Sequence, residues 1–334
     1  MQKGLFILIL FVNTCFAQQS DFKNIDFTRA DLIAKSYKSK KKLDLNKITF
    51  SLTENLNTDV EKLRVIYIWI CHNIANDYRL YALNDRKRKR FKNDSIRLNE
   101  WNSRFKKVLF KKLLKRKRTI CTGYAYLLKE MCNIADIEAK IVNGFARTAD
   151  IDFEKLVYPN HTWNVVKLNN KWYLCDPTWS TGTSYPDENK FVFDYNDGYF
   201  LTEPNIFIKN HLPIHRNNSI LQEKVPSFKE FSEMPLLYGE AYSVLKEHIT
   251  PNKMHHEIKQ NETFLFKYQL KKKIDINKVK FIFSSANEKT IKPKITLQKD
   301  ILTLQHTFKK RGFYDVHLYI ENKIMATYTF KIYK

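Results

Sequence analysis

The C-terminal quarter of the chain alternates apolar and polar residues with a period of two, and this restricts it to β structure. The alternating runs cover residues 264–270, 281–283, 295–297, 302–308, 314–320 and 328–332. Successive side chains of a strand point to opposite faces, so each run can bury one face. About six or seven short strands at this spacing predict a β-sandwich over residues 251–334.

The rest of the chain shows a helical period. Apolar residues recur at steps of three and four over 60–74 and again over 119–135, which predicts two core helices. Residues 18–60 are expected to approach this core as helices, and 137–146 alternate like a strand. Residues 177–250 are rich in prolines and are expected to be irregular. A length of 334 residues favours two domains, so we expect an α+β chain divided into 18–250 and 251–334.

The N-terminus has the composition of a secretion signal. Lys3 supplies a short positive region, an unbroken apolar run covers 5–12, and Ala17 ends a segment of small residues. The apolar run is too short to span a bilayer. We therefore expect residues 1–17 to be a signal peptide and the protein to be exported, periplasmic or secreted. Lipid attachment at Cys15 is an alternative, although Thr14 before it fits a lipoprotein signal poorly.

The charge of the chain is concentrated in one stretch. The formal net charge is +23, and residues 86–118 hold 16 Lys or Arg against 2 acidic residues. Apolar residues in its second half predict an amphipathic basic helix: Phe105, Val108, Leu109, Leu113 and Leu114. One interpretation is a surface that contacts an anionic polymer or a membrane. The other is a solvated insertion whose apolar edge packs on the domain. No specific nucleic-acid site is evident.

Four cysteines remain after a signal peptide is removed: Cys71, Cys121, Cys132 and Cys175. Their spacing matches neither a disulfide framework nor a zinc site. Cys71 and Cys132 fall on helical runs and are expected to be buried. Cys121 differs, because it stands at the start of the helix predicted over 119–135. Unpaired amides and the helix dipole at such a position stabilise a thiolate, while Gly123 allows a neighbouring segment to approach closely.

Residues 161–176 predict a tight hairpin. Two strand-like runs flank Asn169-Asn170, and asparagine tolerates the positive φ angles of a two-residue turn. If these residues form the turn, the numbers of opposed residues sum to 339. His161 and Asp176 then lie on one face as diagonal neighbours, within reach of a hydrogen bond, and Cys175 lies on the other. A cysteine, a histidine base and an orienting carboxylate are the parts of a cysteine enzyme.

The same residues resemble the three sequence blocks of the transglutaminase-like superfamily. The blocks are CTGYA at 121–125, HTWN at 161–164 and CDPTW at 175–179, separated by spacings that also resemble the family. The runs 68–74 and 199–204 are similar to the kyphoscoliosis-peptidase branch, and residues 207–208 and 211–213 would continue the second of these. Thr119 departs from the family, which usually has glycine there, and the insertion 86–118 is unusual.

The resemblance implies a papain-like core in which a Cys-bearing helix packs on an antiparallel sheet that carries His and Asp. It implies that Cys121 attacks an amide, that His161 protonates the leaving amine and that Asp176 orients the imidazole. The substrate would be a protein, a peptide or a cell-wall amide, and the acceptor water or an amine, without metal or cofactor. An alternative is a weakly active or inactive binding module with a basic surface.

Three further features complete the expectations. Trp163 and Trp179 are candidates to line the cleft, although buried aromatics more often belong to a core. No partner pattern is evident for the other histidines, including His211, which are interpreted as structural or solvated. The run 312–316 is similar to the tyrosine corner of immunoglobulin-like domains, with Val316 in place of their second cysteine.

Overall fold

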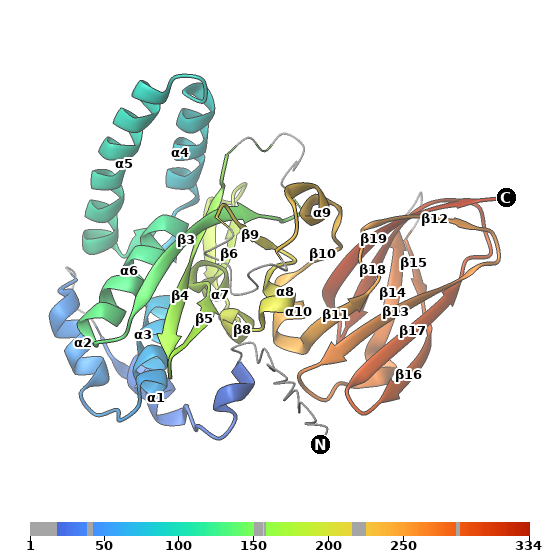
Figure 1. Ribbon diagram of the computed structural model, residues 1–334, viewed down its shortest axis with the longest axis horizontal. Coiled ribbons are helices and arrows are strands. Elements are labelled where there is room, and N and C mark those ends of the chain that lie inside the picture. The colour runs from blue at the N-terminus through green and yellow to red at the C-terminus, as the bar shows by residue number, and fades with distance from the viewer. Residues whose placement is uncertain (1–18, 39–42, 150–155, 157, 216–224, 285–287) are drawn as a thin grey trace, which may run out of the picture.

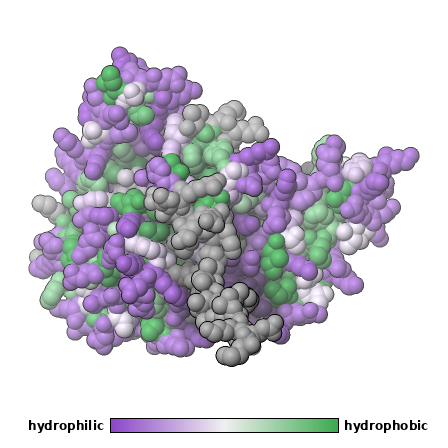
Figure 2. Space-filling view, in the orientation of Figure 1, coloured by the Kyte–Doolittle hydropathy of each residue, from purple (hydrophilic) through white to green (hydrophobic). Residues whose placement is uncertain are grey.

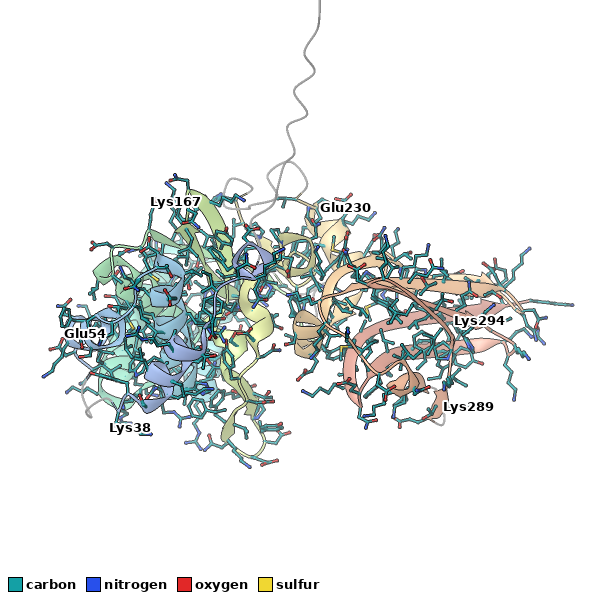
Figure 3. All side chains as sticks on the ribbon, turned by 90° about the horizontal axis from the view of Figure 1, so that it is seen from below. Lys38, Glu54, Lys167, Glu230, Lys289 and Lys294 are labelled. Atoms are coloured by element: carbon teal, nitrogen blue, oxygen red, sulfur yellow. The ribbon has the colours of Figure 1, made fainter. Side chains whose placement is uncertain are left out.

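The computed structural model describes residues 19–38, 43–149, 156, 158–215, 225–284 and 288–334. The expected signal peptide, residues 1–17, lies outside them. Figure 1 shows a helix-rich core beside a region of sheets, joined along the long axis of the molecule. Figure 3 gives the same division from below, with Lys38 and Glu54 at the core end and Lys289 and Lys294 at the other. None of the described helices is both long and apolar enough to cross a membrane.

Helices form the first part of the core, as the sequence predicts. The elements are η1 (Gln19–Phe22), α1 (Thr28–Ser36), α2 (Leu45–Thr53) and α3 (Asp59–Asn73). A capping box in which Thr58 and Glu61 bond each other's backbone amides starts α3. Ten residues of α3 are buried, namely Val60 and every residue from Leu63 to Cys71. A helix that is buried on all sides must lie inside the domain, and α3 packs between α1, α2 and α6 (Cys121–Ile134).

The α6 helix packs on a five-stranded antiparallel sheet. The strands are β3 (Ala139–Ala146), β4 (His161–Leu168), β5 (Lys171–Cys175), β8 (Phe200–Thr202) and β9 (His211–Pro213), in the order β8-β5-β4-β3-β9. Two hydrogen bonds fix α6 in this position. Asn164 Nδ2 of β4 donates to the Ala125 carbonyl at 2.9 Å, and the Tyr124 hydroxyl donates to the Ile74 carbonyl at 2.7 Å. This is the core that the family resemblance implies.

The predicted hairpin register is confirmed. Leu168 pairs with Lys171 and Asn164 pairs with Cys175, so opposed numbers sum to 339. Asn169 and Asn170 have φ angles of 47° and 61°, as a two-residue turn of this type requires. Cys175 packs with α3 and α6, whereas Trp163 belongs to the apolar cluster behind the sheet. The expected separation of faces is therefore present.

The basic stretch folds as a helical hairpin that projects from the core (Figure 1). Its helices are α4 (Tyr78–Arg90) and α5 (Ser95–Arg116), and the two-residue strands β1 (Ala75–Asn76) and β2 (Arg118–Thr119) pair in parallel at its base. The buried apolar residues are Leu80, Phe105, Leu109 and Leu113. Val108 is 47% exposed and does not belong to the packed stripe. Figure 2 shows a mainly hydrophilic surface over the hairpin.

Residues 177–250 contain more regular structure than we expected. The elements are α7 (Pro177–Thr181), β6 (Gly182–Tyr185), β7 (Lys190–Phe193), η3 (Asp197–Tyr199), β8, α8 (Pro204–Phe207), β9, α9 (Phe228–Glu233), β10 (Leu236–Leu237), α10 (Gly239–Val244) and β11 (Leu245–Thr250). Strands of two or three residues are too short to show an alternating pattern. Two of them, β8 and β9, nevertheless complete the core sheet.

The C-terminal region consists of two further sheets. Its remaining elements are β12 (His255–Lys259), β13 (Thr263–Leu270), η6 (Ile276–Lys278), β14 (Val279–Ser284), β15 (Lys289–Ile291), β16 (Lys294–Gln298), β17 (Ile301–Thr307), β18 (Gly312–Ile320) and β19 (Lys323–Tyr333). One sheet has the order β10-β19-β18-β14-β15, with β12 also paired to β19, and the other has the order β11-β13-β17-β16. Apolar residues of both sheets form a single cluster, which continues to the back of the core sheet.

Two details of this region differ from the expected pattern. The sheets are antiparallel except for β12, which runs parallel to β19. The chain changes sheet on either side of β12, so this strand is not in a hairpin with its sequence neighbours. In addition, β11 pairs with β13 although it precedes residue 251, where the C-terminal region was expected to start. Register shifts near Glu247 and Thr250 interrupt the alternation that would have revealed β11.

Candidate active site

Cys121 is the first residue of α6. Ile120 precedes the helix without a side-chain cap, so the first amides of α6 have no capping side chain. The amide of Thr122 donates to the Cys121 sulfur instead. Of the four cysteines in the described residues, all free, only Cys121 is partly exposed. A thiol at a helix start, with amide donors and solvent access, meets the structural conditions for reactivity.

The approach to Cys121 depends on Gly123. A Cβ at this glycine would lie 1.8 Å from Oγ1 of Thr119, whose side chain is completely buried. The expected close approach of a neighbouring segment is therefore made by the residue that departs from the family pattern. Thr119 and Gly123 together set how the segment before Cys121 enters α6.

The hairpin brings His161 and Asp176 together. Nε2 of His161 lies 2.7 Å from Oδ2 of Asp176, and the same imidazole is hydrogen-bonded to the Cys121 thiol. Since Nε2 faces the carboxylate, Nδ1 is the nitrogen left for the sulfur. The structure thus places the three predicted residues in one chain of hydrogen bonds.

The electrostatics of this chain favour an ion pair. Burial alone would raise the pKa of the Cys121 thiol, but the hydrogen bond and charge of His161 outweigh it and the pKa is lowered. Burial would lower the pKa of His161, but the charge and hydrogen bond of Asp176 raise it to about 10. A lowered thiol pKa beside a raised imidazole pKa is the condition for a thiolate and an imidazolium to coexist near neutral pH.

Asp176 is held from four directions. Oδ1 accepts the amides of Thr178 and Trp179 as the N-cap of α7, and Oδ2 accepts both His161 and His211. The side chain is completely buried, which by itself would raise the pKa of the carboxyl group. The charge of His161 and the hydrogen bonds of both histidines reverse this, so the pKa lies below its usual range. Asp176 therefore remains a carboxylate whose two oxygens are fully used.

The sequence analysis missed the role of His211. We expected no partner for it, yet its Nε2 donates to Oδ2 of Asp176 at 3.1 Å and its ring stacks on Phe207 at 3.8 Å. Burial lowers the pKa of His211 to about 4, so it serves as a neutral donor. The available signal was the run 211–213, which was associated with the 199–204 block without any assignment of contacts.

The two tryptophans lie behind His161 rather than in the cleft. Trp179 stacks on the His161 ring at 5.1 Å and Trp163 at 6.1 Å, and both also contact the His211 ring. Trp163 is only 2% exposed. Neither residue lines the cavity at Cys121. Their effect is to fix the imidazole plane and to keep water from one face of it.

A cavity of about 370 Å³ opens at Cys121 and His161. One wall consists of strand and loop residues around Asn143 and 158–162, and the other of α4 and α5. The residues from the two helices are Tyr81, Asn84, Asp85, Arg88, Asn102, Phe105, Lys106, Leu109 and Phe110. The basic insertion is therefore a wall of the candidate substrate cleft as well as a projecting surface.

Three buried side chains at the site also have the composition of a metal site. One ligand atom from each of His161, Asp176 and His211 lies within 4.8 Å of the others. Hydrogen bonds of normal length already account for all three, because both Nε2 atoms point to one carboxylate oxygen at 2.7 and 3.1 Å. The arrangement does not require an ion to explain its geometry, and the expectation of a metal-free site stays a prediction.

The other cysteines differ from Cys121 in their surroundings. Cys71, Cys132 and Cys175 are completely buried, as the sequence predicts for the first two. Burial raises the pKa of all three thiols, to about 12 for Cys175. Among the described cysteines, only Cys121 combines a lowered pKa with access to a cavity.

Comparison with known proteins identifies the domain that carries this site. The family described as the transglutaminase-like superfamily matches residues 46–177, which include all of the hydrogen-bonded triad. Residues 46–177 belong to the transglutaminase-like superfamily. The chain is similar to kyphoscoliosis peptidase of Mus musculus, with 30% identity over 66% of this chain and 30% of the relative. For the Homo sapiens protein, identity is 32% over 59% of this chain and 27% of the relative.

A more distant relative is Hillarin of Drosophila melanogaster, 22% identical over 64% of this chain and 25% of its own length. The chain thus spans about 30% or less of the length of these curated relatives. The family match concerns residues 46–177 of this chain. The activities of the whole relatives do not transfer with it.

Proposed function

We propose that this chain is a cysteine enzyme that cleaves or transfers amide bonds through a thioester on Cys121. One observation carries the proposal: the Cys121 thiol, at a helix start and open to a cavity, is hydrogen-bonded to His161, whose far nitrogen is held by Asp176 at 2.7 Å. A nucleophile, a base and an orienting carboxylate in this order are the requirements of acyl transfer.

Each residue has a distinct role in this mechanism. The Cys121 thiolate attacks the carbonyl carbon, and the backbone amide of Cys121 is a donor for the developing oxyanion. The His161 imidazolium gives its proton to the leaving amine as the C–N bond breaks, which leaves a thioester. His161 then takes a proton from water or from an acceptor amine as that group attacks, and Cys121 is released. Asp176 keeps the imidazole in the required tautomer throughout.

The test is a comparison of wild type with Cys121→Ala on peptide and cell-wall amide mixtures. Hydrolysis is measured as newly formed amino and carboxyl groups, and transfer as covalent incorporation of a fluorescent primary amine. We expect one of the two products from wild type and neither from the variant. Equal signals from both proteins would remove the enzyme proposal.

A weakly active or inactive binding module is the second candidate. The exposed positive charge of α4 and α5 favours it, because most of the 16 basic residues of 86–118 have no carboxylate within ion-pair distance in the described part of the chain. Leu80, Phe105 and Leu109 of the hairpin pack together with Ile120, and only isolated apolar residues such as Ile96 and Val108 are exposed. Charge rather than apolar insertion would therefore hold an anionic polymer or membrane surface. Such binding should weaken steeply with added salt.

Export is proposed from the sequence of residues 1–17 alone. The mature protein would begin at Gln18 and act outside the cytoplasm. Intact-mass analysis of protein from a secreting host tests this, since retention of Met1 or a lipid mass on Cys15 would contradict it.

The C-terminal sheets are proposed to form an immunoglobulin-like β-sandwich that supplies no catalytic residue. The support is the Tyr314 hydroxyl, which donates to the carbonyls of Lys310 and Arg311, each at 3.2 Å. A tyrosine that bonds back to the preceding backbone is typical of the corner in such domains. The parallel strand β12 is a departure from that arrangement.

A further inference from the structure

The charged residues of the cleft are not balanced. Among the described residues, the side chains with charge that line the cavity besides His161 are Asp85, Arg88 and Lys106, all from α4 and α5. Arg88 is partly exposed and Lys106 is exposed. Within the described residues, no carboxylate lies at ion-pair distance from either cation. In the described part of the chain, the two cations that share this cavity with Cys121 are therefore not neutralised by a carboxylate.

The single carboxylate of this wall is already compensated. Oδ1 of Asp85 accepts the Tyr158 hydroxyl at 2.9 Å, and Oδ2 pairs with the Lys89 ammonium at 2.8 Å. A carboxylate with a cation and a hydroxyl bound to it offers little repulsion to an incoming anion. The electrostatic potential of this wall at a bound group is therefore positive.

Arg88 is held beside the catalytic histidine. Its Nη1 donates to the carbonyl of Pro159 at 3.0 Å, and its guanidinium lies 4.4 Å from the centre of the Tyr158 ring. Pro159 precedes His161 by two residues. These contacts use one of the five N–H donors of the guanidinium. A fixed guanidinium with free donors is suited to bidentate binding of a carboxylate.

We propose that the cleft takes acidic peptide segments, with a Glu or Asp side chain close to the amide that reacts. This inference rests on the proposed function for the site and adds its substrate class. Arg88 and Lys106 bind the acidic side chains, while aromatic residues such as Phe110 and amides such as Asn102 and Asn143 line the rest of the cavity. Amide-lined and aromatic walls suit a peptide better than a polyphosphate backbone.

The first test measures the field at Cys121 with two alkylating agents of similar size. Iodoacetate is anionic and iodoacetamide is neutral, so the ratio of their rates at Cys121 reports the local charge. We expect Arg88→Gln and Lys106→Gln each to lower the iodoacetate-to-iodoacetamide ratio by about two- to fivefold, since each removes one nearby cation. The iodoacetamide rate of each variant is measured in parallel, so that a change in the thiolate or in His161 cancels in the ratio.

Lys107→Gln is the matched control. Lys107 is the exposed neighbour of Lys106 on α5 and does not line the cavity. Its substitution removes the same overall charge and should leave the ratio within about 1.5-fold of wild type, because exposed charges at greater distance are screened. An equal drop for Lys107→Gln and Lys106→Gln, or no drop for either cleft variant, overturns the proposal.

The second test needs no reactive thiol. Binding of a fluorescent Glu-rich peptide to Cys121→Ala protein is compared with its Gln-for-Glu counterpart by anisotropy. We expect tighter binding of the acidic peptide, weakened by Arg88→Gln and Lys106→Gln but not by Lys107→Gln. If this pattern holds while Cys121 proves inert, the enzyme proposal fails and the acidic specificity stands. Equal binding of the two peptides contradicts the specificity, whatever the thiol does.

Discussion

The transglutaminase-like core and the C-terminal sheets each bury a histidine, and they change its pKa in opposite directions. In the core, Asp176 and Cys121 raise the pKa of His161 to about 10 despite its burial. In the sheets, His248 contacts the Tyr328 hydroxyl at 2.7 Å and the Tyr268 ring, and burial together with the charge of Lys209 lowers its pKa to about 3.

The difference lies in the partners, not in the burial. Asp176 and the Cys121 thiol together make the imidazolium of His161 the stable form. His211, which bonds Asp176 without a thiol beside it, and His248, which bonds a phenol, both stay neutral. Only the first arrangement can hold a thiolate and deliver a proton. The comparison therefore distinguishes a site suited to chemistry from a hydrogen-bonded core. Each variant below alters one of these two regions and leaves the other unchanged.

The largest effect is expected for Asp176→Ala. It leaves His161 and His211 buried without their acceptor and removes the N-cap of α7. Breaking a buried, hydrogen-bonded ion pair costs about 3–5 kcal/mol of unfolding free energy. Urea unfolding at pH 7 measures it. The control is Asp59→Ala, whose exposed pair with Lys62 should change stability by less than about 1 kcal/mol.

The unfolding free energy should also depend on the protonation of Asp176 at acid pH. The pKa of Asp176 is lower in the folded protein than its ordinary value, so its stabilisation is complete above that ordinary value and is lost as the pH falls through the folded pKa. If Asp176→Ala unfolds, Asp176→Asn is measured instead. If Asp176→Ala or Asp176→Asn proved as stable as wild type at pH 7, the described site would be contradicted.

The next effect concerns the entry to α6. Gly123→Ala would place a methyl group against Thr119. We therefore expect the unfolding free energy to fall by about 1–3 kcal/mol from overpacking, and Cys121 to be alkylated more slowly. In a Thr119→Gly background the same change should cost clearly less. The coupling in this double-mutant cycle is the measurement. Additive effects would show that the 1.8 Å approach does not set the position of Cys121.

Much of the site was predictable from local sequence, and its surroundings were not. The register of 161–176 follows from one turn, because Asn169-Asn170 determines which residues oppose each other. The position of Cys121 follows from a helical period. His211 was missed because β9 has three residues and its contact with Asp176 spans 35 positions. No local pattern can report such a contact.

The cleft wall was unpredictable for the same physical reason. The sequence shows that 86–118 is basic and that its apolar residues recur at helical steps, but not which side of the hairpin faces Cys121. That depends on tertiary contacts, such as the 2.8 Å pair between Lys112 and the N-cap residue Asp77. The path of β12 between the two sheets is likewise a property of the assembled strands.

The smallest effect is expected for His248→Phe in the C-terminal sheets. Tyr328 keeps its bond to the Tyr268 hydroxyl, so the loss at pH 7 should be about 1 kcal/mol. The pKa of His248 is lower in the folded protein than in the unfolded chain. Its contribution to stability therefore falls as the pH drops from about 6.5 toward 3. The difference in unfolding free energy between wild type and His248→Phe should therefore be smaller at pH 5 than at pH 7.

Thermal or urea unfolding at both pH values measures this difference. Alkylation of Cys121 in His248→Phe should equal that of wild type. A change in Cys121 reactivity would show that the C-terminal sheets take part in the chemistry of the core and would end the comparison as drawn.

The central claim is that His161 holds Cys121 as a reactive thiolate, and the pH profile of Cys121 alkylation tests it most directly. Iodoacetamide labelling is mapped by mass spectrometry in wild type and His161→Ala. We predict that wild-type Cys121 reacts first among the four cysteines and remains reactive at pH 6, where an ordinary thiol with a pKa of about 8.5 is almost fully protonated. His161→Ala should slow Cys121 about 100-fold or more at pH 6 and shift its profile toward that ordinary pKa. Equal labelling of the four cysteines, or the same profile with and without His161, would contradict the claim.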